Sequence, residues 1–137
     1  MKVIFGFPAF GEDDNEMTPV RIVDMTLVPI QPELNDFDNR TDIAHLVLTL
    51  DPECEIAKRR EIIYCEHQVF PALMNALEKK GLKTRKIRDV RHRRVKYIDT
   101  ISWADYPNQR PGYITFKVDA KFVQQWDSVN SGELVDQ

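Results

Sequence analysis

The sequence predicts an α+β fold, a two-layer sandwich in which a mainly antiparallel sheet carries two helices on one face in a ferredoxin-like order of elements. Three observations favour this class. Residues 43–50 form an apolar run typical of a buried strand. A long helical pattern follows it, and two strand-like segments then precede a second amphipathic helix. Placing both helices on one face of the sheet is the most economical packing for that order.

Length and composition are typical of one globular domain. The chain has 137 residues, of which 42% are hydrophobic and 30% charged. We expect residues 1–137 to form a single domain, with a core at residues 43–132 and a loosely built N-terminal extension of strands and loops at residues 1–42. No apolar run approaches the roughly 20 residues that span a bilayer, and the apolar N-terminus is too short for a signal peptide. We therefore expect a cytosolic protein without a membrane partner.

The N-terminal third predicts one or two edge strands and a loop. Residues 20–30 favour an extended segment with Val20, Ile22, Thr26 and Val28 on one side. Residues 31–42 are rich in acids and Asn and contain a proline, which is typical of a loop. The apolar run at residues 43–50 is nearly continuous, so we expect a strand that is buried on both faces.

A helix is predicted to start at Asp51, because an acid followed by proline is a common way to begin a helix. The helical pattern continues to Lys80, and Gly81 supplies the stop. Pro71 interrupts this pattern, because proline removes a backbone donor and clashes with the preceding turn. We expect either a kinked helix or two helices, of which the second begins near residue 66 or 67.

The second half of the chain predicts strands and a final helix. Residues 84–103 favour strand, with Tyr97 and Trp103 on the same face. Val90 is out of phase with Val95, so a turn or bulge is expected within residues 91–94. After a loop at residues 104–112, a short strand follows at residues 113–118. Asp119 then caps a helix that ends at Gly132 and presents a core-facing stripe of Phe122, Val123, Trp126 and Val129.

Charge is distributed very unevenly along the sequence. Residues 79–96 contain ten basic residues and one acid, a net charge of about +9, whereas the rest of the chain has nine basic and twenty-one acidic residues. Clustered cations raise the local potential whatever the net charge, which indicates an anionic partner. The candidate binding residues, named here the basic strip, are Lys83, Arg85, Lys86, Arg88, Arg91, Arg93, Arg94 and Lys96.

We expect the basic strip to bind the phosphate backbone of RNA or DNA, with Tyr97 and Trp103 as stacking groups for unpaired bases. The strip holds more arginine than lysine, and the planar guanidinium suits phosphate recognition. The alternative class is a protein-interaction module, such as an inhibitor, adaptor or structural subunit, that docks the strip on an acidic surface or offers its own acidic face to a basic partner. Internal pairing or simple solvation of the cations is the third reading. The sequence does not indicate an oligomeric state.

No motif with a specific chemistry is present, so we expect no catalytic residues, no metal site and no cofactor. One enzymatic alternative is a metal-dependent nuclease, because Asp119 and Lys121 have the D-x-K spacing and Asp99 or Asp105 offers a second carboxylate. Chance spacing and the expected helix-capping role of Asp119 explain the same pattern. The three histidines, His45, His67 and His92, lie far apart and lack the spacing of metal ligands.

Overall fold

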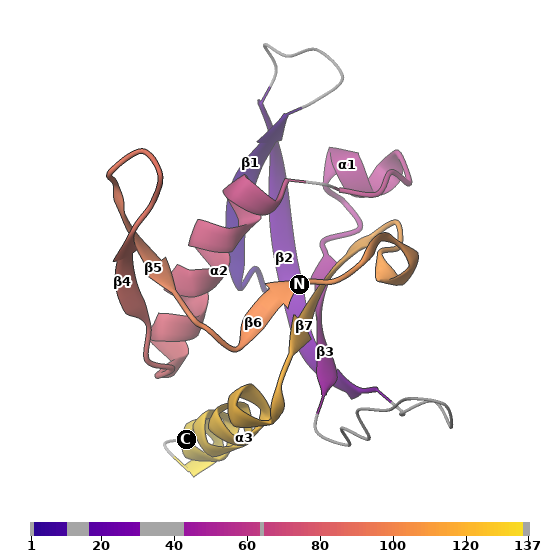
Figure 1. Cartoon of the computed structure of the whole chain (residues 1–137). Helices are drawn as coiled ribbons and strands as arrows, with labels where there is room; N and C mark the ends of the chain where they lie inside the picture. Colours follow the sequence, from indigo (N-terminus) through magenta and orange to yellow (C-terminus); the bar gives the residue numbers. More distant parts are fainter. Residues whose placement is uncertain (1, 11–16, 31–42, 64, 136–137) are drawn as a thin grey trace.

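The computed structural model describes residues 2–10, 17–30, 43–63 and 65–135. Within them lie a five-stranded antiparallel sheet, a separate two-stranded hairpin and three α-helices (Figure 1). The elements in chain order are β1 Phe5–Phe10, β2 Met17–Pro29, β3 Ala44–Leu50, α1 Glu55–Lys58, α2 Glu66–Lys80, β4 Arg85–Arg88, β5 Arg94–Tyr97, β6 Ile101–Trp103, a 3₁₀ turn Tyr106–Asn108, β7 Tyr113–Val118 and α3 Ala120–Val135. The predicted loop at residues 31–42 lies outside the described residues.

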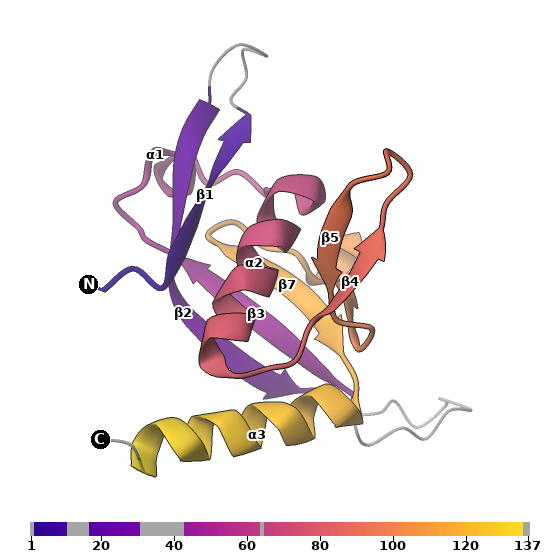
Figure 2. The same cartoon turned by 90° about the vertical axis from the view of Figure 1, so that its left-hand side faces the viewer.

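The α+β class is confirmed, but the ferredoxin-like arrangement with both helices on one face is not. Strands follow the order β1-β2-β3-β7-β6, and the curled sheet resembles half a barrel. Helix α2 lies along the sheet beside β1, whereas α3 crosses the end of the sheet (Figure 2). On one side of β3, the N-terminal strand β2 pairs with β3, and β1 pairs with β2. Residues 85–97 form a hairpin outside the sheet. These two features give a strand order that a ferredoxin-like sheet does not have.

Strand β3 lies at the centre of the sheet and covers the core with one face. Ala44, Leu46, Leu48 and Leu50 are buried, while the residues between them are half-buried. The prediction that this strand is buried on both faces is therefore wrong. Antiparallel sheets commonly pack one face on a core and leave the other facing water.

Strand β2 changes which of its residues face the core. Val20 and Ile22 are fully buried as expected, but a register shift between Ile22 and Asp24 then turns Met25 inward. Thr26 and Val28, which were predicted on the same side as Val20, are exposed. A β-bulge inserts one unpaired residue and so reverses the alternation beyond it.

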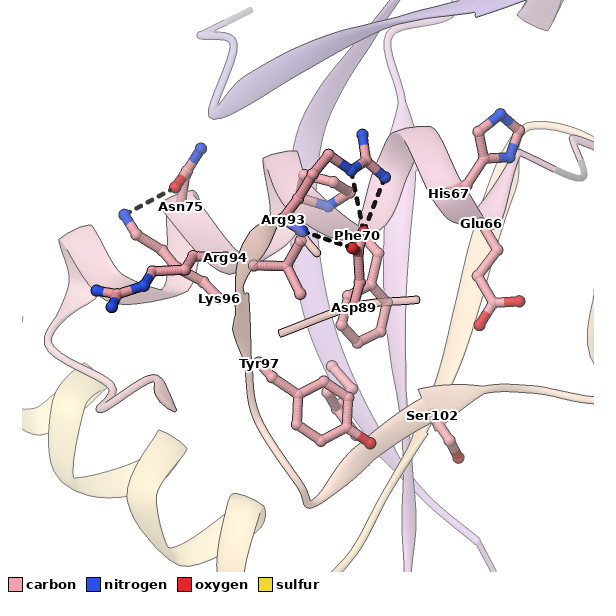
Figure 3. Close-up of a pocket in the computed structure, with 13 residues that line it drawn as sticks. Glu66, His67, Phe70, Asn75, Asp89, Arg93, Arg94, Lys96, Tyr97 and Ser102 are labelled. Carbon is pink, nitrogen blue, oxygen red and sulfur yellow. Dashed lines mark hydrogen bonds and ion pairs between the residues drawn. The ribbon is translucent and has the colours of Figure 1, made fainter. Parts of the chain in front are cut away.

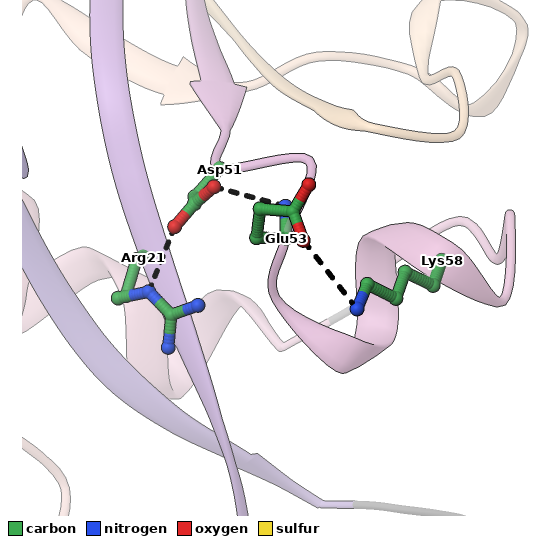
Figure 4. A network of polar contacts seen from close by, with 4 residues as sticks. All are labelled: Arg21, Asp51, Glu53 and Lys58. Atoms are coloured by element: carbon green, nitrogen blue, oxygen red, sulfur yellow. Dashed lines mark hydrogen bonds and ion pairs between the residues drawn. The ribbon is translucent and has the colours of Figure 1, made fainter. Parts of the chain in front are cut away.

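The predicted helical region divides into two helices. The predicted helix start at Asp51 is wrong, because α1 begins at Glu55 with Cys54 at its N-cap. Asp51 instead caps the preceding turn: its Oδ1 accepts a 2.9 Å hydrogen bond from the Glu53 amide, and its Oδ2 lies 2.9 Å from Arg21 Nε (Figure 4). Helix α2 begins at Glu66, as expected, and continues through Pro71. It ends at Gly81, whose φ of 108° and the Leu82 N–H to Leu77 C=O bond form a Schellman cap.

The helices complete the core around the sheet. Val69, Leu73 and Leu77 on α2 are fully buried, and Phe122 and Trp126 on α3 pack on the same core. The predicted cap is confirmed, because the Asp119 carboxylate accepts a hydrogen bond from the Phe122 amide. The prediction that α3 ends at Gly132 is wrong, since the helix continues to Val135. Glycine disfavours the helix by about 1 kcal/mol without forbidding its conformation. The side chain of Val129 lies outside what the structure describes.

Candidate nucleic-acid interface

The basic strip forms the β4–β5 hairpin, which stands beside α2 and outside the main sheet (Figures 1 and 2). Arg85 pairs with Tyr97, Lys86 with Lys96, Ile87 with Val95 and Arg88 with Arg94. A turn separates the strands as predicted, but it spans residues 89–93, and Arg94 already belongs to β5. Helix α2 thus has β1 on one side and β5 on the other.

Asp89 organises the turn of this hairpin. Its Oδ1 accepts the backbone amides of Arg93 and Arg91 at 2.8 and 2.9 Å, and its Oδ2 accepts the Arg93 guanidinium at 3.0 Å. The Arg93 amide contributes most to holding the pKa of Asp89 below its usual value, and the Arg91 amide and the Arg93 side chain add to the effect. His92 takes a left-handed conformation with a φ of 61°, which is typical of a three-residue hairpin loop. His92 and Arg91 therefore have structured backbones at the tip.

The register places four cations on one face of the hairpin. Because side chains alternate along a strand, Lys86 and Arg88 share a face with Arg94 and Lys96, which pair with them from the opposite strand. We name these four residues the cation face. The opposite face carries Arg85, Ile87, Val95 and Tyr97. Like charges directly opposite one another destabilise a strand pair, so the cation face costs the hairpin stability.

Three cations of the basic strip are neutralised by nearby acids. Arg85 bonds to Asp99, Arg93 to Asp89, and Lys96 Nζ lies 2.9 Å from Glu78 Oε1 and 3.0 Å from Asn75 Oδ1. The Thr84 hydroxyl and then Lys96 hold the pKa of Glu78 below its usual value. Within the described chain, the other five cations form no ion pair or side-chain hydrogen bond, and all are exposed: Lys83, Lys86, Arg88, Arg91 and Arg94. Internal pairing therefore accounts for less than half of the strip.

A groove of about 760 Å³ runs between α2 and β5, and we name it the α2–β5 groove (Figure 3). Its apolar lining includes Phe70 and Tyr97, whose rings are stacked with centroids 6.1 Å apart and planes at 27°. Arg94 and Lys96 belong both to this groove and to the cation face. The lining residues are Glu66, His67, Phe70, Pro71, Asn75, Asp89, Arg93, Arg94, Val95, Lys96, Tyr97, Ile101 and Ser102.

The two predicted stacking groups lie on different strands, not on one. Tyr97 ends β5 and lines the groove, whereas Trp103 belongs to β6 in the main sheet. The Trp103 ring meets the core residue Phe116 edge-on at 5.2 Å. The chain turns at residues 98–100, where the Ile101 amide bonds to the Ile98 carbonyl. This turn separates a segment that the alternation pattern predicted to be continuous.

Several residues of this surface were not predicted from the sequence. Phe70 supports Tyr97, and Asn75 and Glu78 hold Lys96. All three lie on the side of α2 that faces the hairpin. Their helical spacing places them near one side of α2, but the sequence does not show that β5 packs there.

The carboxylates of the nuclease alternative have structural partners. Asp99 and Asp119 line a small pocket of about 220 Å³ together with Lys117. However, Asp99 bonds to Arg85 and Asp119 caps α3. Asp105 lies elsewhere, before the 3₁₀ turn. Among the residues with described positions, no group of three or more His, Cys, Asp or Glu side chains is arranged to hold a metal ion.

Comparisons with protein-family models, with curated proteins and with solved structures find no match to this chain. In the described residues, no helix has the length and apolar character needed to cross a membrane.

Proposed function

We propose that this protein binds the phosphate backbone of nucleic acid through the cation face and the turn of the β4–β5 hairpin, and that it acts by binding and not by catalysis. The observation that supports this most strongly is the pairing of Arg88 with Arg94, with no acid bonded to either in the described chain. Lys86 and Lys96 repeat the like-charge pairing two residues along the strands, although Lys96 is bonded to Glu78.

The arrangement of like charges in the hairpin costs folding stability that a bound phosphate would recover. Like charges opposite one another across a strand pair destabilise it. A phosphate placed between two guanidinium groups would convert this repulsion into two charge-assisted attractions. Release of counterions from the nucleic acid adds a favourable, salt-dependent contribution to binding.

The exposure of the free cations supports the same proposal. Arg91 lies at the hairpin tip, and Lys83 lies between α2 and β4, so the exposed charges extend along the whole hairpin. From Lys83 to Asp99 the chain has eight basic residues and two acids, a net charge of about +6. A field of one sign attracts a polyanion before contact and raises the association rate.

The test is fluorescence anisotropy with labelled single- and double-stranded oligonucleotides at low and moderate salt. In one variant, Arg88→Glu, Arg91→Glu and Arg94→Glu are combined, which leaves Arg93 free to hold Asp89. The matched control combines Lys58→Glu, Lys117→Glu and Lys121→Glu, which change the net charge equally at exposed sites outside the hairpin. We expect log K to fall with log salt by about 0.7–0.9 per phosphate contact.

The hairpin variant should lose most of the binding and most of the salt slope, while the control retains them. Absence of binding by the wild-type protein at low salt would overturn the proposal. Equal loss in both variants would show a response to net charge alone and would also contradict a defined site.

An acidic protein surface remains the second candidate partner because of the hairpin tip. Val90 is 96% exposed there and Ile87 is 36% exposed, and such apolar groups suit a protein contact more than a phosphate contact. For this alternative we expect polyglutamate to displace a bound oligonucleotide and Val90→Ser to weaken polyglutamate binding more than oligonucleotide binding. Polyglutamate can also compete for the cations if phosphate binding is the function, so the larger effect of Val90→Ser on polyglutamate, and not displacement alone, would indicate a protein partner.

We also propose a cytosolic location, which is supported by Cys54, a buried cysteine that forms no disulfide bond. A fluorescent fusion viewed in cells tests this directly. Localisation outside the cytosol would contradict it.

A further inference from the structure

We infer that the nucleic acid is single-stranded and that one unpaired base enters the α2–β5 groove, where it stacks on Tyr97 while the neighbouring phosphates lie on the cation face. This inference rests on the proposed function and adds the class of ligand and the place of the base.

The Tyr97 ring has the support that a stacking platform needs. Phe70 stacks against it at 6.1 Å, and Phe70 in turn meets the fully buried Phe116 at 5.9 Å. The ring is half-buried and lines the groove (Figure 3). A ring held from behind by the core loses little conformational freedom when a base stacks on it.

The groove is continuous with the phosphate-binding surface. Arg94 and Lys96 line it, and they also form the β5 side of the cation face. Tyr97 lines the groove from the opposite face of the hairpin, so a strand whose phosphates contact Arg94 brings a base to the Tyr97 ring by crossing the β5 edge, which borders the groove. The groove volume of about 760 Å³ lies within the roughly 300–1,000 Å³ typical of ligand pockets.

The groove also holds polar groups that match the edge of a base. Lys96 Nζ can only donate, so its 3.0 Å contact identifies the Asn75 atom there as the amide oxygen. The Asn75 amide nitrogen is then left as a donor, and Ser102 adds an exposed hydroxyl on the opposite wall. A donor and a hydroxyl on either side of an aromatic ring suit a planar base that carries both acceptors and donors.

A duplex does not fit this arrangement as well. Its bases are paired and stacked, so a base reaches the groove only after it leaves the helix. An acidic peptide could neutralise the same cations but would not need the aromatic platform. The contribution of an unpaired base to the affinity therefore distinguishes a single strand from a duplex and from an acidic peptide.

The experiment compares three labelled ligands of about twelve nucleotides, within the roughly 4–16-nucleotide range of single-strand sites. They are a single strand of mixed sequence, a strand of equal length with every base replaced by an abasic sugar, and a duplex. We expect the wild-type protein to bind the mixed strand roughly 5- to 100-fold more tightly than the abasic strand. We also expect it to bind the mixed strand more tightly than the duplex.

The variant Tyr97→Leu should bring the affinity for the mixed strand close to that for the abasic strand, and Tyr97→Phe should restore it. Tyr113→Leu is the matched control, because Tyr113 is an exposed aromatic residue on β7 that does not line the groove. Circular dichroism verifies that each variant is folded, and the abasic comparison needs only the unmodified protein.

The results separate base recognition, the preference for a single strand, and phosphate binding itself. Equal binding of the mixed and abasic strands would overturn base recognition while leaving phosphate binding in place. Tighter binding of the duplex would overturn the single-stranded assignment. Tighter binding of polyglutamate than of the mixed strand at equal charge concentration would indicate an acidic polypeptide and overturn the inference. No binding of any strand at low salt would overturn the proposed function itself.

Discussion

Arg88 and Arg94 lie directly opposite each other across the β4–β5 hairpin, both are exposed, and neither is bonded to an acid in the described chain. In an isolated hairpin this pair lowers stability. The pair lies in the most basic segment of the chain. It therefore disfavours folding of the hairpin while it favours binding of a polyanion.

Replacing one member of that pair should therefore improve folding and impair binding. Arg88→Glu places an acid opposite Arg94, which should raise the free energy of unfolding by about 0.2–1 kcal/mol. The same change should weaken oligonucleotide binding. Urea denaturation and anisotropy measure the two effects, and Arg88→Gln is the control that removes the charge without reversing it. A loss of both stability and affinity would contradict the argument.

Lys86 and Lys96 face each other but should differ in their contribution to stability. Lys96 links β5 to α2 through Glu78 and Asn75, whereas Lys86 forms no ion pair with an acid in the described residues. We expect Lys96→Met to lower the free energy of unfolding by about 0.5–1 kcal/mol, since the pair is partly exposed. Lys86→Met should leave stability within about 0.5 kcal/mol. Equal effects in chemical denaturation would show that the contact with α2 is not a stabilising one.

The turn of the hairpin should respond to acid through Asp89. Its folded-state pKa lies below the usual 3.8, mainly because the Arg93 amide bonds to the carboxylate. The carboxylate therefore adds stability that is fully present above pH 3.8 and is lost as the pH falls through the lower folded-state pKa. An NMR titration should move the Arg91 and Arg93 amide resonances with a shared midpoint below 3.8. Asp89→Asn should abolish this titration, and a midpoint above that value would contradict the assigned bonds.

Gln109 should be among the residues most sensitive to substitution. It is buried, its Nε2 donates to the carbonyls of Ala104 and Thr115, and its Oε1 accepts the Thr115 amide at 3.0 Å. Gln109→Leu leaves the Thr115 amide buried without a partner, which should cost about 2–3 kcal/mol. The exposed neighbour Asn108 provides the control, since Asn108→Ala should change stability by less than about 0.5 kcal/mol. Similar unfolding midpoints for the two variants would rule out this role.

Local patterns in the sequence were sufficient to predict much of the secondary structure. The strand at residues 113–118, the start of α2 at Glu66, the Gly81 stop and the Asp119 cap are each determined by residues close to one another in the chain. Capping and strand alternation act over a few residues, so they can be read without the fold. The hairpin turn near residue 91 was visible for the same reason.

Other features depend on residues far apart in the sequence. The bulge after Ile22 reverses the inward face of β2, and it is defined only by pairing with β3. Gln109 is buried because it bonds to the backbone of Thr115 on β7. Tyr97 is positioned by stacking on Phe70 of α2. No local pattern shows these partners.

The amino-acid order alone places ten of the nineteen basic residues in one short segment, residues 79–96. Which cations of the basic strip have an acidic partner depends on the fold. Arg85 and Lys96 are neutralised by Asp99 and Glu78, fourteen and eighteen residues away along the chain, while Arg88 and Arg94 are brought together without an acid bonded to either in the described residues. Charge content is a property of composition, whereas charge pairing acts over a few ångströms and depends on which elements the fold packs side by side.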